Sequence, residues 1–212
     1  MFMQLQRALT PSRKADLLTE LVQTVSGLLL VGFLWTHMLF VGSILLGVEA
    51  FNRLADFMEQ FRLLDIAVVF VILTAGAHVG AVLRRIPSRW QEQKIVWKHA
   101  RTIKHNDTWS WIFQAVTGSA MLILITIHVF VVVYAGIDSK LSADRVHSWM
   151  LAFYAVLLVL AEYHASVGLY RALVKWGVVK RHSLKRVLTV ITICTIGLGL
   201  ASLGVFFALG GS

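Results

Sequence analysis

Five long apolar runs, separated by shorter polar stretches, dominate the pattern of the chain. Four of them contain no Asp, Glu, Lys or Arg, and the fourth along the chain contains a single acid, Glu162. About 20 apolar residues suffice to cross a bilayer as a helix, whereas an open sheet facing lipid would leave its edge groups without hydrogen bonds. The pattern predicts an all-α membrane protein with five transmembrane helices, over residues 21–48, 66–83, 108–137, 146–170 and 187–210.

The polar stretch at residues 49–62 has a helical pattern of its own. Apolar side chains recur there at spacings of three and four residues and acids lie between them: Phe51, Leu54, Met58 and Phe61, with Asp56 and Glu59. This spacing predicts an amphipathic helix that lies along the outer membrane interface.

Composition agrees with a membrane protein. Hydrophobic residues make up 58% and charged residues 15% of the chain, against about 45–50% and about 25% in soluble domains. A disordered chain, a solenoid and a disulfide-rich secreted module are therefore excluded. The single cysteine, Cys194, allows no intrachain disulfide, no CxxC metal site and no CxxCH attachment of haem.

The net charge of +9 is explained by the positive-inside rule better than by binding to nucleic acid. Of the 20 Lys and Arg residues, all but four fall in the N-terminal tail or in the connections at residues 84–105 and 171–186. The four on the opposite side are Arg53, Arg62, Lys140 and Arg145. The distribution predicts a cytoplasmic N-terminus, an outer C-terminus and two basic cytoplasmic loops.

Four histidines lie inside the membrane, one in each of the first four predicted helices: His37, His78, His128 and His164. With a rise of about 1.5 Å per residue, His37 and His128 are roughly 26 and 32 Å from the inner ends of their helices. His78 and His164 are only about 9 and 10 Å from the inner ends of theirs. The depths predict an outer pair and an inner pair, separated by roughly 15–20 Å.

Two pairs of imidazoles in a bundle of four helices suit two bis-histidine b haems, because neutral imidazole is a good ligand for iron. The same residues are compatible with two different roles. Each histidine can instead make one hydrogen bond between helices, or the four can serve a proton relay. A structural zinc site is disfavoured, because it needs four ligands at one level.

An internal repeat supports the haem interpretation. Residues 23–27 and 114–118 both read Gln-x-Val-[Ser/Thr]-Gly, and a histidine follows each glycine by ten residues. Ten residues span about 15 Å, which places Gly27 and Gly118 near the inner pair. A missing side chain there makes room for a flat macrocycle, although small residues also serve close helix contacts in membranes.

Further polar residues have weaker assignments. Haem propionates prefer cations and hydrogen-bond donors, and residues at suitable depths are Gln23, Thr24, Trp111 and Lys175 at the inner end and Arg145 at the outer end. Glu162 should face away from His164, which follows it by two residues, and an intramembrane carboxylate suits proton transfer or a hydrogen bond between helices. His99, His105, His147 and His182 fall in loops or at span ends and are expected at the surface.

These residues resemble the di-haem cytochrome b membrane-anchor subunit of quinol:fumarate reductases and succinate:quinone reductases. The resemblance extends from Gln23 to about Arg186, so the chain is expected to form one transmembrane di-haem domain over residues 1–212. The most specific segments are THMLF at residues 36–40, HNDTWSW at 105–111, EYHASVGLYR at 162–171 and KWG at 175–177.

The resemblance implies that His78 and His164 ligate a proximal haem and that His37 and His128 ligate a distal one. It implies a menaquinol site beside the distal haem with Glu59 as proton acceptor, and a transmembrane proton pathway through Glu162. It also implies a flavoprotein subunit with FAD and an iron–sulfur subunit docked on the cytoplasmic side, in an assembly that is a candidate for a dimer of heterotrimers.

The expected function is anaerobic electron transport in the bacterial inner membrane. Electrons would pass from menaquinol through two b haems to the partner subunits, which reduce fumarate to succinate or run in reverse. Two alternatives remain: the cytochrome b anchor of a hydrogenase or formate dehydrogenase, and, from another class, a haem-free proton-coupled transporter that uses the histidines and Glu162.

Overall fold

The structure is a computed structural model and describes residues 13–86, 89–103, 105–179 and 181–210. Three of the basic residues used to predict the orientation, Arg7, Lys104 and Lys180, lie outside these ranges. The elements in chain order are α2 (Arg13–Gly42), a 3₁₀ turn (Ser43–Leu46), α3 (Val48–Gln60), α4 (Leu63–Leu83), α5 (Trp90–Ile103), α6 (Asn106–Ala135), α7 (Ser139–Arg145), a π-type turn (Val146–Met150), α8 (Leu151–Lys175) and α9 (Arg181–Leu209).

Five segments are long and apolar enough to cross a membrane, which confirms the predicted number of spans: Lys14–Leu46, Leu63–Leu83, Asn106–Ala135, Ser139–Lys175 and Ser183–Leu209. Their ends differ from the prediction. The first helix already begins at Arg13 and ends at Gly42, and Gly47 then turns the chain with a φ of 114°. Hydropathy locates a span but not its ends, because polar residues extend a helix into the interface and a glycine decides where it turns.

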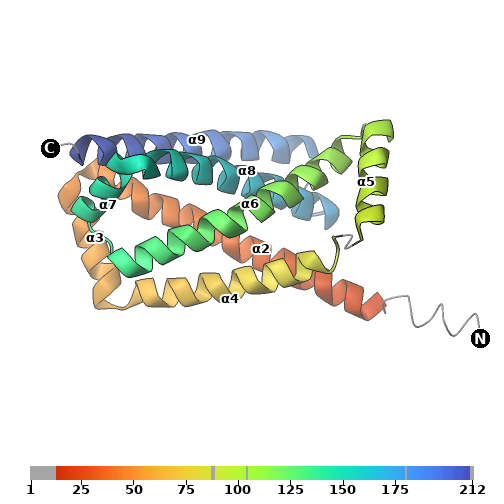
Figure 1. The fold of residues 1–212 in the computed structure, drawn as a ribbon, viewed down its shortest axis with the longest axis horizontal. Helices are drawn as coiled ribbons and strands as arrows, with labels where there is room; N and C mark the ends of the chain where they lie inside the picture. The colour runs from red at the N-terminus through yellow and green to blue at the C-terminus, as the bar shows by residue number, and fades with distance from the viewer. Residues whose placement is uncertain (1–12, 87–88, 104, 180, 211–212) are drawn as a thin grey trace, which may run out of the picture.

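The long helices form an elongated bundle (Figure 1). Helix α2 packs along α4 and α6 packs along α8, while α9 packs along α8 and also reaches α2. Short helices α3 and α7 lie at one end of the bundle and α5 lies at the other (Figure 1). We refer to these ends of the bundle as the α3 end and the α5 end.

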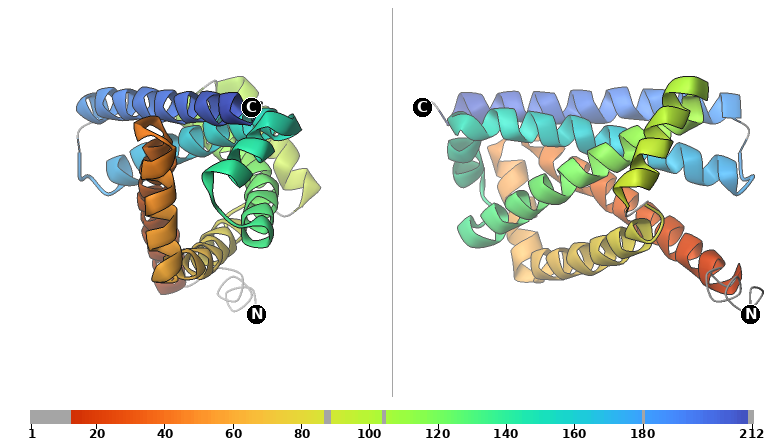
Figure 2. Two further views of the ribbon diagram at one scale, coloured as in Figure 1. Left: turned by 90° about the vertical axis from the view of Figure 1, so that its left-hand side faces the viewer. Right: turned by 45° about the vertical axis from the view of Figure 1, so that its right-hand side comes forward.

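Helix α3 confirms the predicted amphipathic helix and crosses the end of the bundle between α2 and α4 (Figure 2, left). Its Phe51 is buried, with ring centroids 5.2 Å from Phe40 and 5.3 Å from Phe206. Leu54 and Met58 are half-buried on the same face. Phe61 was expected on this face but is 55% exposed, because α3 ends at Gln60 and the chain turns at Arg62 with a left-handed φ of 52°.

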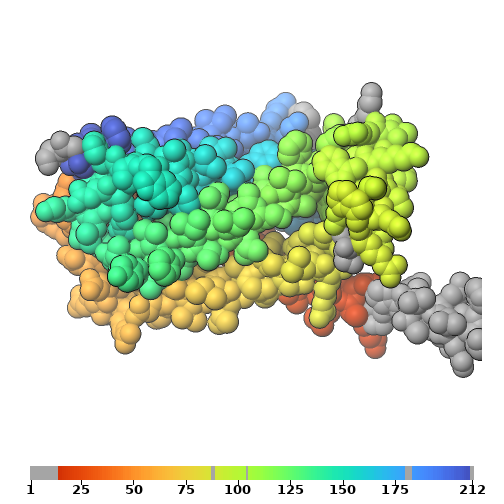
Figure 3. All heavy atoms as spheres, viewed as in Figure 1, coloured from red at the N-terminus to blue at the C-terminus, as the bar shows by residue number. Residues whose placement is uncertain are grey.

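Helix α5 corrects the expectation that residues 84–105 form only a loop. It runs across the bundle axis and projects from the α5 end (Figures 1 and 3). Ala100 is fully buried, and the Trp97 ring meets Trp109 of α6 edge-on at 6.2 Å. Part of the signal is present in the sequence, since the apolar residues Val96, Ala100 and Ile103 recur at spacings of four and three along one side of the helix.

Candidate functional site

A large cavity of about 2650 Å³ runs inside the bundle and is lined by residues of α2, α4, α6 and α8. Typical small-molecule pockets measure about 300–1,000 Å³, so this cavity has room for more than one cofactor-sized group. All four intramembrane histidines line it: His37, His78, His128 and His164.

Two of these histidines meet towards the α3 end. The rings of His37 on α2 and His128 on α6 have centroids 5.9 Å apart and planes inclined at 66°. Phe33 stacks on His37 at 5.7 Å, and Tyr154 meets His128 edge-on at 5.6 Å. The Nδ1 atom of His128 is buried and has no hydrogen-bond partner among the described residues.

The other two histidines meet towards the α5 end. The rings of His78 on α4 and His164 on α8 have centroids 6.5 Å apart and planes inclined at 79°. Each is held from the helix beside it: Ser26 Oγ of α2 lies 3.1 Å from His78 Nδ1, and Thr117 Oγ1 of α6 lies 3.1 Å from His164 Nδ1. Both hydroxyl residues belong to the repeated motif, but the sequence predicted no role for them.

The paired rings fit a metal held from two sides. Two imidazoles that bind one metal through bonds of about 2.0–2.1 Å need ring centroids roughly 6 Å apart, which agrees with the separations of 5.9 and 6.5 Å. Across the described ranges, no three His, Cys, Asp or Glu side chains converge as ligands. Each pair could therefore offer only two ligands to a metal, and a haem would suit such a site because its macrocycle provides the other ligands.

The two motif glycines lie against the rings of the histidine pair at the α5 end. A Cβ atom on Gly27 would be 3.3 Å from His78 Cε1, and one on Gly118 would be 3.0 Å from His164 Cε1. The motif predicted space for a macrocycle at these positions. In the structure, the space in front of each glycine holds an imidazole ring, so the glycine first of all lets the ring approach the neighbouring helix.

Polar residues expected near haem propionates all line the cavity: Gln23, Thr24, Trp111, Lys175 and Arg145. Lys175 is paired with Glu20, whose other oxygen accepts from Arg85 Nη2 at 3.3 Å. The Thr24 hydroxyl accepts from Trp176 Nε1 at 3.2 Å. Two further cations line the cavity at the α5 end, Arg85 and Arg171, whose place in the sequence predicted only a loop charge.

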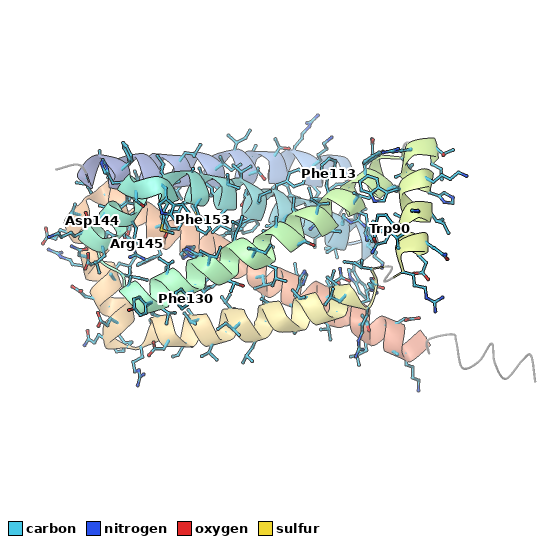
Figure 4. All side chains as sticks on the ribbon, in the orientation of Figure 1. Trp90, Phe113, Phe130, Asp144, Arg145 and Phe153 are labelled. Carbon is cyan, nitrogen blue, oxygen red and sulfur yellow. The ribbon has the colours of Figure 1, made fainter. Side chains whose placement is uncertain are left out.

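At the α3 end, Arg145 is the last residue of α7, and its side chain reaches back to the turn after α6 (Figure 4). Its guanidinium donates to the carbonyl oxygens of Leu141 at 2.9 Å and Gly136 at 2.7 Å. Both acceptors are neutral, so the positive charge is not cancelled by these contacts, and it remains available to an anion in the cavity.

Glu59 and Met58 line the cavity from α3, and Arg62 lines it from the turn before α4. Two other acids of α3, Asp56 and Glu49, do not line it. Asp56 is exposed, and Glu49 is paired with Arg53 at 2.5 Å on the exposed side of the helix. The structure thus distinguishes three acids that the sequence places within about three helical turns of one another.

Glu162 is fully buried and faces α9, on the side of α8 away from His164. Its Oε1 accepts hydrogen bonds from Ser166 Oγ at 3.0 Å and Thr192 Oγ1 at 3.1 Å. Its Oε2 is buried and has no partner in the part of the chain that the structure describes. The carboxyl group therefore lies between α8 and α9 with one oxygen held and one unpaired.

Comparison with known proteins assigns the family. The family described as "Succinate dehydrogenase/Fumarate reductase transmembrane subunit" matches residues 91–207. The fumarate reductase cytochrome b subunit of Helicobacter pylori is 33% identical over 207 residues, which cover 90% of this chain and 80% of that protein. The corresponding subunit of Wolinella succinogenes is 32% identical, with 95% and 87% covered. The succinate dehydrogenase cytochrome b558 subunit of Bacillus subtilis is 27% identical, with 88% and 94% covered.

The matched region contains the α6 and α8 halves of both histidine pairs, and the relatives align over nearly the whole chain. Together with five apolar helices, this makes the chain a multi-pass protein of the bacterial inner membrane. The chain belongs to the succinate dehydrogenase/fumarate reductase transmembrane subunit family, as a membrane cytochrome b subunit.

Proposed function

We propose that this subunit conducts electrons across the membrane between menaquinol and an iron–sulfur partner, as part of a complex that reduces fumarate to succinate or works in reverse. The observation that carries the proposal is the arrangement of the four histidines as two facing pairs in one cavity. In this proposal residues 1–212 form one di-haem domain, with the haem-binding bundle made by α2, α4, α6 and α8.

The residues that would hold the two b haems follow from the pairs. His78 and His164 would ligate the proximal haem at the α5 end, and His37 and His128 the distal haem at the α3 end. Haem iron, when bound, supplies one-electron exchange. The chain's own part is to fix the four imidazoles, to keep water out with the apolar walls of the cavity, and to offer cations such as Lys175 and Arg145 to the propionates.

The α5 end would face the cytoplasm, with the N-terminus inside and the C-terminus outside. The positive-inside rule supports this orientation, because the exposed residues Lys94, Lys98 and Arg101 lie on α5. The iron–sulfur subunit and the flavoprotein subunit with FAD would dock on this face, next to the proximal histidine pair. The dicarboxylate chemistry would then take place in the partner subunits.

Two glutamates would accept or transfer protons. Oxidation of a quinol releases two protons with two electrons, so a quinol site benefits from a nearby carboxylate that is open to water. Glu59 suits this role because it lines the cavity at the α3 end and is itself exposed. Glu162, buried with one unpaired oxygen inside the membrane, suits a proton pathway across it.

The first test is the haem content of the purified complex. We expect two non-covalent b haems for each copy of this chain, both low-spin, together with co-purified flavoprotein and iron–sulfur subunits. Pyridine haemochrome analysis against protein concentration measures the ratio. Absence of a Soret band would support a haem-free transporter, and co-purification of a hydrogenase or formate dehydrogenase subunit would support the other anchor. Either result would contradict the proposal.

A second test concerns orientation. In a background where Cys194 is replaced by Ser, the exposed residues Gln60 of α3 and Gln91 of α5 are each changed to Cys. A membrane-impermeant maleimide added to intact spheroplasts should label Gln60→Cys and should leave Gln91→Cys unlabelled until the membrane is permeabilised. Labelling of Gln91→Cys in intact spheroplasts would reverse the proposed topology and place the docking face outside.

A further inference from the structure

The repeated Gln-x-Val-[Ser/Thr]-Gly segments make the same contact twice. On α2 the motif touches a histidine of α4, and on α6 it touches a histidine of α8. In both cases the hydroxyl lies 3.1 Å from the histidine Nδ1, and the glycine that follows lets the ring edge approach to within 3.3 or 3.0 Å of a Cβ position. The two halves of the bundle therefore present one arrangement, and both copies act on the pair at the α5 end.

The hydrogen bonds of the hydroxyls determine which nitrogen of each ring carries the proton. Ser26 Oγ donates to the Val22 carbonyl at 2.5 Å, and Thr117 Oγ1 donates to the Phe113 carbonyl at 2.7 Å. A hydroxyl has one proton, and a carbonyl oxygen only accepts. Each hydroxyl is therefore left with lone pairs to offer the histidine, an arrangement that favours Nδ1 as the N–H donor.

His78 has a second contact that leads to the same tautomer. Its Nδ1 lies 3.2 Å from the backbone carbonyl of Gln23, which cannot donate. In a neutral imidazole with its proton on Nδ1, the lone pair is on Nε2. This is the form in which histidine binds a metal through Nε2 while its other nitrogen donates to a fixed acceptor.

We propose that Ser26 and Thr117 are positioning residues that hold His78 and His164 in the Nδ1–H tautomer, with Nε2 presented to the proximal haem iron. This inference rests on the proposed haem-binding function. It assigns roles to the last two positions of the motif: the hydroxyl fixes the tautomer and the ring direction, and the glycine admits the ring.

The pair at the α3 end is built differently. His128 Nδ1 has no hydrogen-bond partner in the described part of the chain. A fixed acceptor raises the basicity of a histidine ligand and orients its ring. The hydroxyl positions should therefore affect the proximal haem and leave the distal haem unchanged, which gives the test an internal reference in the same molecule.

The experiment compares Thr117→Val and Ser26→Ala in the whole complex. Thr117→Val keeps the side-chain shape and removes the acceptor of His164 Nδ1, so we expect proximal haem to be retained about 10–100-fold more weakly, measured by transfer to a haem-scavenging protein. The midpoint potential of the retained proximal haem should rise, because a less basic ligand stabilises ferric iron less. Ser26→Ala should have the smaller effect, since His78 keeps the Gln23 carbonyl.

Three controls accompany these variants. Thr117→Ser keeps the hydroxyl and should behave as the wild type. Thr189→Val and Ser202→Ala remove hydroxyls whose contact within the described ranges is with the carbonyl four residues earlier, and should change neither haem. An unaltered proximal potential and electron paramagnetic resonance signal in Thr117→Val would overturn the proposal, and so would equal loss of both haems. The haem function itself would fail separately, if wild-type protein lacked haem or if His164→Ala kept both haems.

Discussion

Replacement of His78 or His164 by Ala is expected to remove the proximal haem and to leave the distal one in place. The haem content should fall from two to one per chain, and quinol-dependent fumarate reduction should fall to the background. The reason is geometric. The ring centroids of His78 and His164 are 6.5 Å apart, and no third described His, Cys, Asp or Glu side chain is placed to replace a lost ligand. Optical redox titration of each variant measures which component disappears.

The pairing of the histidines also predicts which variants should have the same spectrum. His37→Ala and His128→Ala should share one spectrum, which lacks the distal component, and His78→Ala and His164→Ala should share the other. A double variant within one pair should lose no more haem than either single variant, whereas a double variant across pairs should lose both haems. His99→Ala, at an exposed position on α5, is the matched control. A shared spectrum for His37→Ala and His78→Ala would contradict the assignment of His37 and His78 to different haems.

Glu59→Gln is expected to lower quinol oxidation by about 10²–10⁴-fold, the usual contribution of a positioned acid or base, and to leave both haems bound. The amide keeps the size of the side chain but cannot take up the proton that quinol oxidation releases. Fumarate reduction with an artificial donor that feeds the partner subunits directly should be unaffected. Steady-state assays with the two donors on the same preparation measure the difference.

Two acids on the same helix provide the controls for this variant. Asp56→Asn and Glu49→Gln change neighbouring carboxylates that do not line the cavity, so quinol oxidation should remain near the wild-type rate. Normal quinol turnover in Glu59→Gln would remove Glu59 from the quinol site. A large loss in Asp56→Asn or Glu49→Gln would move the proton acceptor to that residue.

The site combines residues from helices that are far apart in the chain. Each histidine pair joins one helix of the α2/α4 pair to one helix of the α6/α8 pair, and the cavity is lined by residues of all four helices. A cofactor held there would tie the two helix pairs together. At the α5 end, the Glu20 carboxylate of α2 also connects the two helix pairs without a cofactor, because it contacts both Arg85 after α4 and Lys175 of α8.

Much of this could be predicted from the sequence, because it depends on local regularities. Hydropathy and length gave the five spans, and the rise of a helix gave the depths at which His37 meets His128 and His78 meets His164. The rotation of about 100° per residue likewise placed Glu162 on the side of α8 away from His164. Each of these inferences needs only the repeat of one helix and the thickness of the membrane.

The tertiary structure alone decided which neighbour each polar group contacts. That Ser26 holds His78, that Thr117 holds His164, and that Glu59 lines the cavity while Asp56 does not, all depend on the helix that lies opposite. The same is true of Glu162, whose partner Thr192 is 30 residues away in the chain. In an apolar medium, the shapes of the helix surfaces and a few hydrogen bonds decide which helices pack together. The periodicity of a single helix predicts neither the complementary shape nor the hydrogen-bond partner on the other helix.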